Sequence, residues 1–240
     1  MTASRARSLA WAYDGAAHLR ALMARMGEDA FAAPSALPGW SRAHVLSHIA
    51  RNADAMVNLL EWARTGTVTP AYPSRERRDA DIEAGAKRTP AEIREDVLGS
   101  GDRLAAVVRG MPESAWSATV THPNGSPILA ASVPWYRARE MWIHAVDLDV
   151  GASFADMPVP MLLALVHEVT GQLGSREGCP SLQLVASDVD RTWALAGKGR
   201  TAESVTGPIA GLAAWLTGRS RGKELRTGSG RRAPALPAWL

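Results

Sequence analysis

The first 150 residues of the chain repeat one pattern, in which apolar residues recur every three or four positions between breaks rich in proline and glycine. This spacing is typical of helices that bury one face. Helices are therefore expected over residues 5–27, 41–66 and about 90–109, and from residue 134 onward. A polar loop is expected after the second helix, and a short hairpin around Asn124-Gly125 before the fourth. Such helices bury their apolar faces best against one another, so we expect a four-helix bundle.

The pattern changes after Gly151. The expected elements are a helix over 158–173, strands over 181–188, 191–197 and near 202–207, and a compact apolar helix over 207–219. Helices and strands mixed along the chain in this way are typical of an α+β domain. We therefore expect a two-domain α+β protein, with a helical bundle over residues 1–151 and a smaller α+β domain over residues 152–240.

The cysteine content and the hydropathy restrict the cellular compartment. The chain contains one cysteine, Cys179, so it cannot form an intrachain disulfide, as expected for a protein of the reducing cytosol. No stretch approaches the roughly 18 uninterrupted apolar residues of a membrane helix, and the N-terminus lacks the apolar core of a signal peptide. We expect a cytoplasmic protein without a membrane partner.

Basic residues gather near the C-terminus, although the formal net charge is only +3. They are Arg219, Arg221, Lys223, Arg226, Arg231 and Arg232. Such a cluster could bind nucleic acid, attract a small polyanion, or belong to a solvated and mobile tail. No aromatic residue interleaves with the cluster, and we expect no nucleic-acid partner.

Glu140 and His144 lie four positions apart, which places both side chains on one face of the last bundle helix. His48 lies on the apolar side of the second helix. Two interpretations follow from the spacing. Glu140 and His144 could hydrogen-bond to one another with His48 as a core histidine, or all three could converge on a metal with one coordination position left for a ligand. Asp147 could orient one of the metal-binding side chains through a hydrogen bond, but we expect it to be a solvated acid at the helix end.

Other catalytic motifs are missing from the sequence. His167 and Glu168 lack the second histidine of a zinc-protease helix. The chain also has no phosphate-binding or dinucleotide-binding glycine loop, and no nucleophile elbow of a serine hydrolase.

Three stretches carry a resemblance to a known family: LPGWSRAHVLSHIARNADAM, PWYRAREMWIHAVDL and VTGPIAGLAAWLTGR, together with the closing PAWL. The chain resembles the mycothiol-dependent maleylpyruvate isomerase family, which belongs to the DinB-like four-helix metalloproteins. The specific motifs are Gly-Trp-Ser before the histidine helix, Arg-x-x-Glu-x-x-x-His, and Trp-Leu-x-Gly-Arg. The resemblance covers nearly the whole chain. It implies a DinB-like bundle followed by an α+β domain similar to sterol carriers.

The resemblance implies that His48, Glu140 and His144 bind a divalent metal, with zinc as the first choice, whereas His44 does not stand at the ligand position. Many DinB-like relatives have histidine where Glu140 stands, so the carboxylate favours the isomerase branch. The family converts maleylpyruvate to fumarylpyruvate in gentisate-type aromatic catabolism. A metal-bound thiolate adds reversibly to the double bond, which can then rotate. Cys179 lies outside every metal-bearing motif, so the thiol is expected to come from outside the chain, and the resemblance implies that it is mycothiol.

Maleylpyruvate is a dianion, and the resemblance implies that Arg219 binds one of its carboxylates, with the second domain contributing to the active-site cleft. Arg219 could instead offset the dipole of the helix that it follows. Arg137 and Arg139 flank Glu140 in sequence and are expected to point away from the Glu140–His144 face.

Two alternative functions remain at this point. The nearer one is another mycothiol-dependent enzyme on the same scaffold, such as a thiol S-transferase, which would keep the metal residues but need no dianion site. The more distant one is a non-catalytic ligand-binding module, because the second domain resembles a fold that binds apolar ligands. The resemblance favours a monomer.

Overall fold

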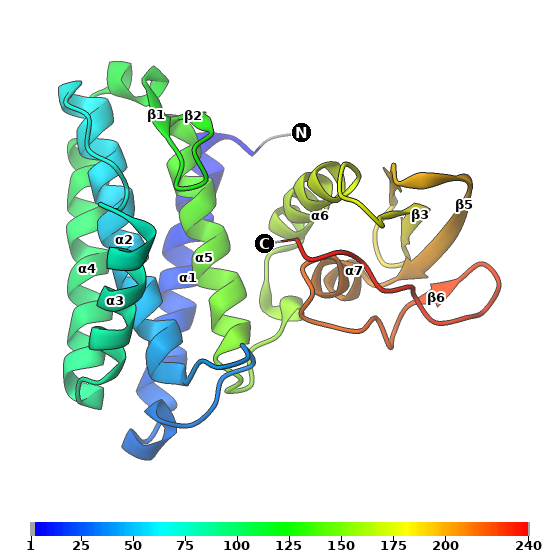
Figure 1. Ribbon diagram of the computed structural model, residues 1–240, viewed down its shortest axis with the longest axis horizontal. Helices are drawn as coiled ribbons and strands as arrows, with labels where there is room; N and C mark the ends of the chain where they lie inside the picture. The colour runs from blue at the N-terminus through cyan, green and yellow to red at the C-terminus, as the bar shows by residue number, and fades with distance from the viewer. Residues whose placement is uncertain (1–2, 240) are drawn as a thin grey trace. The chain divides into compact units, whose positions relative to one another are not determined.

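The computed structural model describes residues 3–239. The chain divides into two compact units, Ser4–Ala152 and Ser153–Leu240 (Figure 1). The first unit is helical apart from one small hairpin, and the second contains both helices and a sheet. The predicted α+β fold class is therefore confirmed.

The first unit is built on four long helices. They are α1 (Arg5–Arg25), α2 (Arg42–Thr65), α4 (Pro90–Gly110) and α5 (Val133–Asp147). α1 packs against α5, and α2 packs against both α4 and α5, so that the four helices run side by side as a bundle (Figure 1). The four helices expected from the apolar spacing are all present.

Side-chain caps fix where the bundle helices begin. Ser41 Oγ accepts a hydrogen bond from the backbone N–H of His44 at the start of α2. Thr89 and Glu92 cap α4 reciprocally, since each side chain bonds to the backbone N–H of the other residue. α2 ends at Gly66, whose φ of 75° is a left-handed conformation that glycine adopts without strain.

The segment after α2 contains a helix where the sequence predicts a polar loop. α3 (Arg75–Ala86) packs against α2 and buries two of its residues. Most of its side chains are charged or small, so the apolar spacing that reveals the other helices is missing. Ion pairs of Arg75 with Asp79 and of Arg77 with Asp81, each four positions apart, stabilise it instead. The expected loop was wrong because these pairs substitute for an apolar stripe.

Short elements complete the first unit. They are the 3₁₀ turns η1 (Glu28–Phe31), η2 (Glu113–Ser117) and η3 (Ala130–Ser132), and the strands β1 (Thr119–Thr121) and β2 (Pro127–Leu129). β1 and β2 pair antiparallel around a turn in which Gly125 has a φ of 88°. The predicted hairpin is thus confirmed.

A close approach of α1 to α5 shapes the bundle interior. A Cβ atom on Gly15 of α1 would lie 2.8 Å from Met141 Cβ and 2.8 Å from Trp142 Nε1, so only glycine fits there without a shift. Trp142 Nε1 donates a hydrogen bond of 2.9 Å to the backbone oxygen of Trp11. This contact holds α5 against α1 on the side away from α2.

The second unit is a four-stranded sheet with helices packed on it. Its elements are η4 (Phe154–Asp156), α6 (Val159–Leu173), β3 (Pro180–Ala186), β4 (Arg191–Leu195), β5 (Lys198–Gly207), α7 (Ile209–Leu216) and β6 (Arg226–Thr227). The strand order is β4-β3-β5-β6, and only the β3–β5 pair is parallel. α6 packs against α7 and β4, while α7 also contacts β3 and β5. Every element expected from the sequence is present, and β6 is an addition to them.

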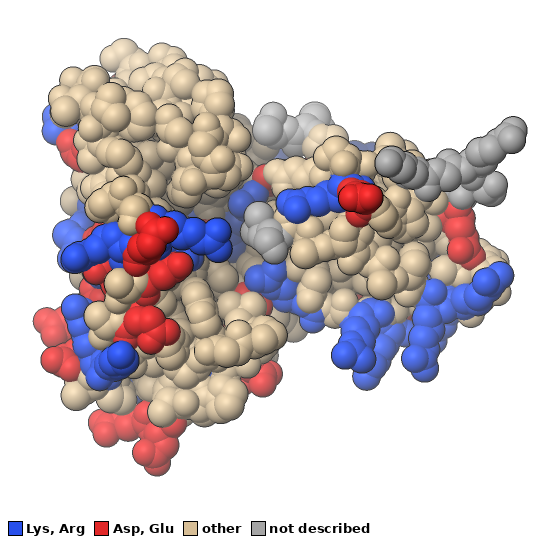
Figure 2. Space-filling view, in the orientation of Figure 1, with Lys and Arg blue, Asp and Glu red and all other residues tan. Residues whose placement is uncertain are grey.

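The segment after α7 packs onto the second unit, which argues against the alternative of a solvated, mobile tail. β6 pairs with β5, and the Trp239 side chain near the end of the chain is 2% exposed. Trp239 Nε1 donates to Gln172 Oε1 at 2.5 Å, and Trp215 Nε1 donates to the Pro234 oxygen at 3.0 Å. Basic side chains gather on the face of this unit near β6 in Figure 2. Among residues 3–239, no helix combines the length and apolarity that crossing a membrane requires.

Candidate metal centre

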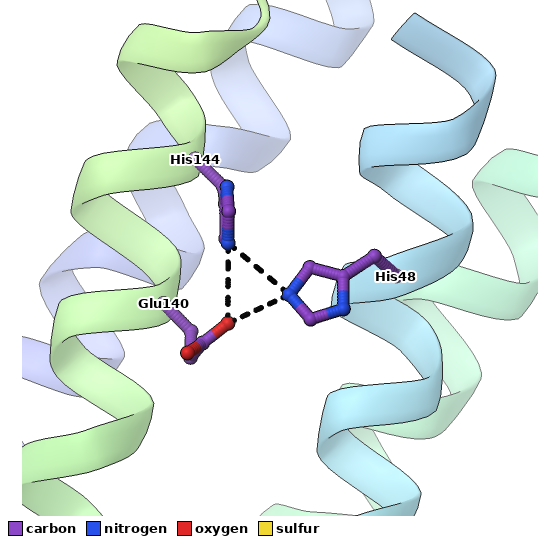
Figure 3. Close-up of side chains that lie close together, drawn as sticks. All are labelled: His48, Glu140 and His144. Carbon is purple, nitrogen blue, oxygen red and sulfur yellow. Dashed lines mark hydrogen bonds and ion pairs between the residues drawn. The ribbon is translucent and has the colours of Figure 1, made fainter. Parts of the chain in front are cut away.

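Three side chains from two helices meet inside the bundle. His48 comes from α2, and Glu140 and His144 come from α5, one turn apart (Figure 3). His48 Nε2 lies 2.8 Å from Glu140 Oε2 and 3.1 Å from His144 Nε2, and His144 Nε2 lies 3.3 Å from Glu140 Oε2. The structure therefore brings together all three residues that the sequence singles out.

The spacing of these three atoms suits a divalent metal ion. Ligand atoms about 2 Å from a tetrahedral ion lie about 3.3 Å from one another. The three distances between His48, Glu140 and His144 fall close to this value, and each residue offers one ligand atom. Two histidines and one carboxylate are also a donor set of catalytic zinc sites. The residues could therefore hold a metal with few adjustments.

The charges in the cluster depend on one another. Burial raises the pKa of Glu140, but hydrogen bonds from His144 and His48 and their charges outweigh burial and hold the pKa well below its usual value. Burial lowers the pKa of His144, but its bonds to Asp147 and Glu140 outweigh this and raise the pKa to about 9. For His48, burial dominates and lowers the pKa. Without a metal, the cluster thus holds an ionised Glu140 beside a protonated His144.

Asp147 orients His144, which contradicts the expectation that it is solvated. Its side chain is fully buried, and Asp147 Oδ2 lies 2.9 Å from His144 Nδ1. The loop that contains Ala36 covers this end of α5. The backbone N–H of Ala36 donates a hydrogen bond to the backbone oxygen of Asp147. A carboxylate that accepts from Nδ1–H makes Nε2, which faces the cluster, the nitrogen that becomes available to a metal once its proton leaves.

Arg137 also differs from its expected direction. It is 6% exposed, and its Nη1 donates to the Ile49 backbone oxygen at 2.9 Å and to Asn52 Oδ1 at 2.7 Å, both on α2. Burial lowers the pKa of Arg137 to about 10, although the nearby charge of Glu140 opposes this effect. Arg137 is therefore a cation at neutral pH that joins α2, which carries His48, to α5, which carries Glu140 and His144.

The sequence reading missed two residues at this site, Arg78 beside His48 and Tyr72 beside Arg78. Arg78 of α3 places its Nη2 3.2 Å from His48 Nδ1, and its guanidinium carbon lies 5.7 Å from the centre of the Tyr72 ring. Burial raises the pKa of Tyr72, which also interacts with Arg78. A third neighbour is Trp40, whose ring centre lies 5.7 Å from that of His48. The sequence could have pointed to Arg78 only through α3, whose oppositely charged residues four positions apart are the one local sign of a helix there.

The other residues considered from the sequence lie elsewhere. His44 Nδ1 accepts from the backbone N–H of Ser41, so it belongs to the cap of α2. Arg219 lies in the second unit, where its Nη1 donates to the Thr217 oxygen at the end of α7. Cys179, in the same unit, is 2% exposed, and burial raises the pKa of its thiol.

Comparisons with known proteins agree with this geometry. Residues 13–149 match the family model described as the mycothiol maleylpyruvate isomerase N-terminal domain. Two crystal structures, of the mycothiol-dependent maleylpyruvate isomerase and of a histidine-to-alanine mutant of it, superpose with a TM-score of 0.93. They are 32% identical to this chain over 100% of both chains.

Two uncharacterised proteins from strains of Mycobacterium tuberculosis are also similar, at 30% identity over 156 residues. The matched region is 62% of this chain and spans 58% of the length of those relatives. The family model covers more than half of the chain and includes the whole histidine–carboxylate cluster. The chain therefore belongs to the mycothiol-dependent maleylpyruvate isomerase family.

Proposed function

We propose that this protein converts maleylpyruvate to fumarylpyruvate with mycothiol as the thiol cofactor. The observation that carries the proposal is the cluster of His48, Glu140 and His144 in a chain that superposes over its full length on a mycothiol-dependent maleylpyruvate isomerase. The cluster supplies the site for chemistry, and the likeness to the solved enzyme indicates which chemistry it is.

We propose that the cluster binds a divalent metal, with zinc as the first candidate, through His48 Nε2, Glu140 Oε2 and His144 Nε2. Zinc accepts nitrogen and oxygen ligands in this number and keeps a position for a further ligand in catalytic sites. Such a metal would stabilise a thiol in its thiolate form near neutral pH.

The residues of the chain prepare the site for this role. Asp147 keeps a proton on His144 Nδ1, so that Nε2, which faces His48 and Glu140, would give up its proton to bind a metal. Glu140 stays ionised because its pKa is held low, and it therefore provides a negative charge that offsets a divalent cation. Trp40 packs beside His48 and limits the access of water to that ligand.

The thiol must come from outside the chain. Cys179 is the only cysteine, lies in the second unit, and is buried with a raised pKa, which makes its thiolate scarce at neutral pH. In the proposed reaction the sulfur of mycothiol forms a bond to one alkene carbon of maleylpyruvate. The former double bond becomes single and rotates, and the carbon–sulfur bond then breaks to give the trans isomer. The thiol is regenerated, so no oxidant or reductant is needed.

We further propose that Arg219 binds a carboxylate of the dianionic substrate. A guanidinium suits a carboxylate because its N–H groups form a planar fork. The support is the Trp-Leu-x-Gly-Arg motif that Arg219 ends.

The test uses the full chain loaded with zinc. Mycothiol and maleylpyruvate are added, and the formation of fumarylpyruvate is followed by its absorbance and by proton NMR. Product that requires both the protein and mycothiol supports the proposal. If the zinc-loaded protein gives no product above the rate with mycothiol alone, the assignment is wrong.

One contact favours a second function, a mycothiol S-transferase. Arg219 already donates to a backbone oxygen at the end of α7, as an arginine with a purely structural role would. An S-transferase needs the metal cluster but no dianion site. Transfer of mycothiol to an uncharged electrophile, with no isomerisation of maleylpyruvate, would identify this alternative.

We also propose that the protein acts as a monomer in the cytoplasm and binds no nucleic acid. A single, buried cysteine suits a reducing compartment. Sedimentation of the purified protein, with and without duplex DNA, tests the monomer and the absence of a nucleic-acid partner.

A further inference from the structure

Arg78 is the cation nearest to the metal cluster on the side of α3. Its Nη2 lies 3.2 Å from His48 Nδ1, and its Nη1 lies 2.6 Å from Asp79 Oδ1. The Arg78 side chain is 26% exposed, whereas His48 is 8% and Glu140 is 20% exposed. The guanidinium therefore stands between a buried ligand residue and solvent. In Figure 2, basic and acidic side chains gather over α3.

The contact between Arg78 and His48 determines where His48 carries its proton. A guanidinium only donates hydrogen bonds, so His48 Nδ1 must accept. A neutral His48 then carries its proton on Nε2, which faces Glu140 Oε2 at 2.8 Å. His144 is protonated in the metal-free cluster and carries a proton on each nitrogen, and Asp147 accepts the one on Nδ1. His48 thus lacks the Nδ1 proton that His144 has.

This tautomer of His48 is incompatible with metal binding through Nε2. A histidine that ligates a metal through Nε2 carries its proton on Nδ1 and donates it to an acceptor. Arg78 offers only donors at that position, so the N–H of His48 and the N–H of Arg78 would face one another. The hydrogen bond to Arg78 is then lost. Asp79 can still hold Nη1 and Tyr72 still interacts with the guanidinium, so what Arg78 loses is its contact with His48 next to the cluster.

We propose that Arg78 binds a carboxylate of the substrate, and that ligation of the metal by His48 releases the Arg78 guanidinium for this role. The inference rests on the proposed function, because it takes the substrate to be a dicarboxylate and the cluster to hold a metal. The ring of Tyr72 beneath the guanidinium keeps it close to the cluster. The N–H groups of Arg78 would offer the forked contact that carboxylates favour. Metal binding thereby couples to the binding of a dianion through one side chain.

The first experiment measures the binding of maleate, a dicarboxylate, by calorimetry in the absence of any thiol. Zinc-loaded wild type is compared with Arg78→Gln and with Arg77→Gln. Arg77 is a matched control, because it is the neighbouring arginine on α3, is 67% exposed, and pairs with Asp81 away from His48. We expect Arg78→Gln to weaken maleate binding by about tenfold or more. Arg77→Gln should stay within about twofold of wild type.

The second experiment measures zinc affinity by competition with a chelator. The amide oxygen of Gln at position 78 can accept the Nδ1–H of His48, which the arginine cannot do. We therefore expect Arg78→Gln to bind zinc as tightly as wild type or more tightly. If Arg78 only supported the fold, Arg78→Gln would weaken the binding of both maleate and zinc.

The outcomes separate this proposal from the proposed function. Equal maleate affinity in zinc-loaded Arg78→Gln and Arg77→Gln, no maleate binding to wild type, or weaker zinc binding in Arg78→Gln would each overturn the role of Arg78. A wild-type protein that binds maleate through Arg78 but does not isomerise maleylpyruvate would contradict the proposed function alone. In a protein that does isomerise maleylpyruvate, Arg78→Gln should raise KM for maleylpyruvate more than it lowers kcat.

Discussion

Asp147 Oδ2 lies 2.9 Å from His144 Nδ1, and the Asp147 side chain is shielded from solvent. A buried carboxylate needs a partner, and this one has a histidine whose other nitrogen faces Glu140 and His48. The pair keeps a proton on Nδ1 of His144, so the proton that a metal must displace is the one on Nε2. The metal affinity of the cluster should therefore depend on a residue that is not itself a ligand.

Substitution at Asp147 tests this dependence. We expect Asp147→Asn to weaken zinc binding by about 10–100-fold, since the orienting charge is lost. His144→Ala should lose zinc altogether while the protein remains folded. Zinc content and chelator competition measure both effects, and far-UV circular dichroism checks the fold. Asp149→Asn is the control, because Asp149 is exposed and has a positive φ of 53° that asparagine tolerates. Wild-type zinc affinity in Asp147→Asn would show that Asp147 does not orient the ligand.

Stability of the metal-free protein should fall as pH rises from 6.5 to 9. His144 has a pKa of about 9 in the folded chain and about 6.5 when unfolded, so folding favours its protonated form. That contribution is complete below pH 6.5 and is lost as pH rises through 9, on the order of 3 kcal/mol. Zinc affinity should rise over the same pH range, because zinc must displace a proton from His144. Urea unfolding followed by tryptophan fluorescence measures the first trend, and a rising free energy of unfolding over this window would contradict it.

Arg219→Ala separates the two proposed enzymes. If Arg219 binds a substrate carboxylate, its removal should raise KM for maleylpyruvate by about tenfold or more while zinc content is unchanged. An S-transferase acting on an uncharged electrophile should keep its KM. Steady-state kinetics with both substrates measure the difference. Arg226→Ala is a control of equal charge, since Arg226 is exposed and also donates to backbone oxygens.

Gly15→Ala should destabilise the first unit by roughly 1–3 kcal/mol. The added Cβ would lie 2.8 Å from Met141 Cβ and would push α1 away from α5. Gly101→Ala on α4 is the matched control, because no atom lies within 4 Å of its added Cβ. That variant should be neutral or more stable by up to about 1 kcal/mol, as alanine favours helix more than glycine does. Urea unfolding compares them, and equal stability of the two variants would show that α1 can shift without loss.

The sequence predicts the helices of the bundle well and singles out the three residues that cluster, because both follow from short-range spacing. Glu140 and His144 share a face at any i,i+4 interval, and His48 lies on an apolar side. Spacing does not show that α2 and α5 align these faces at the same height. That alignment depends on how the whole bundle packs, which local patterns do not show. The expectation that the three residues meet came from the family resemblance.

The expectations that failed concern residues whose surroundings are distant in sequence. Asp147 looks solvated because it ends a helix, yet Ala36 belongs to a loop that covers it. Arg137 departs from the Glu140 side by about 60° on the helix, but its long side chain still reaches Asn52 on α2. Arg78 was missed with α3, whose stability comes from charge pairs rather than from an apolar stripe.

The bonds of Arg137 to Ile49 and Asn52 restrict how the bundle can assemble. A slide of α5 along α2 by one residue would move its side chains by about 1.5 Å and turn them by about 100°. Arg137 would then be a charged group inside the protein with its acceptors out of reach, an arrangement that is strongly unfavourable. Apolar side chains tolerate such slips far better than a guanidinium does. Arg137 thus selects one register of the two helices, and in that register alone His48 meets Glu140 and His144.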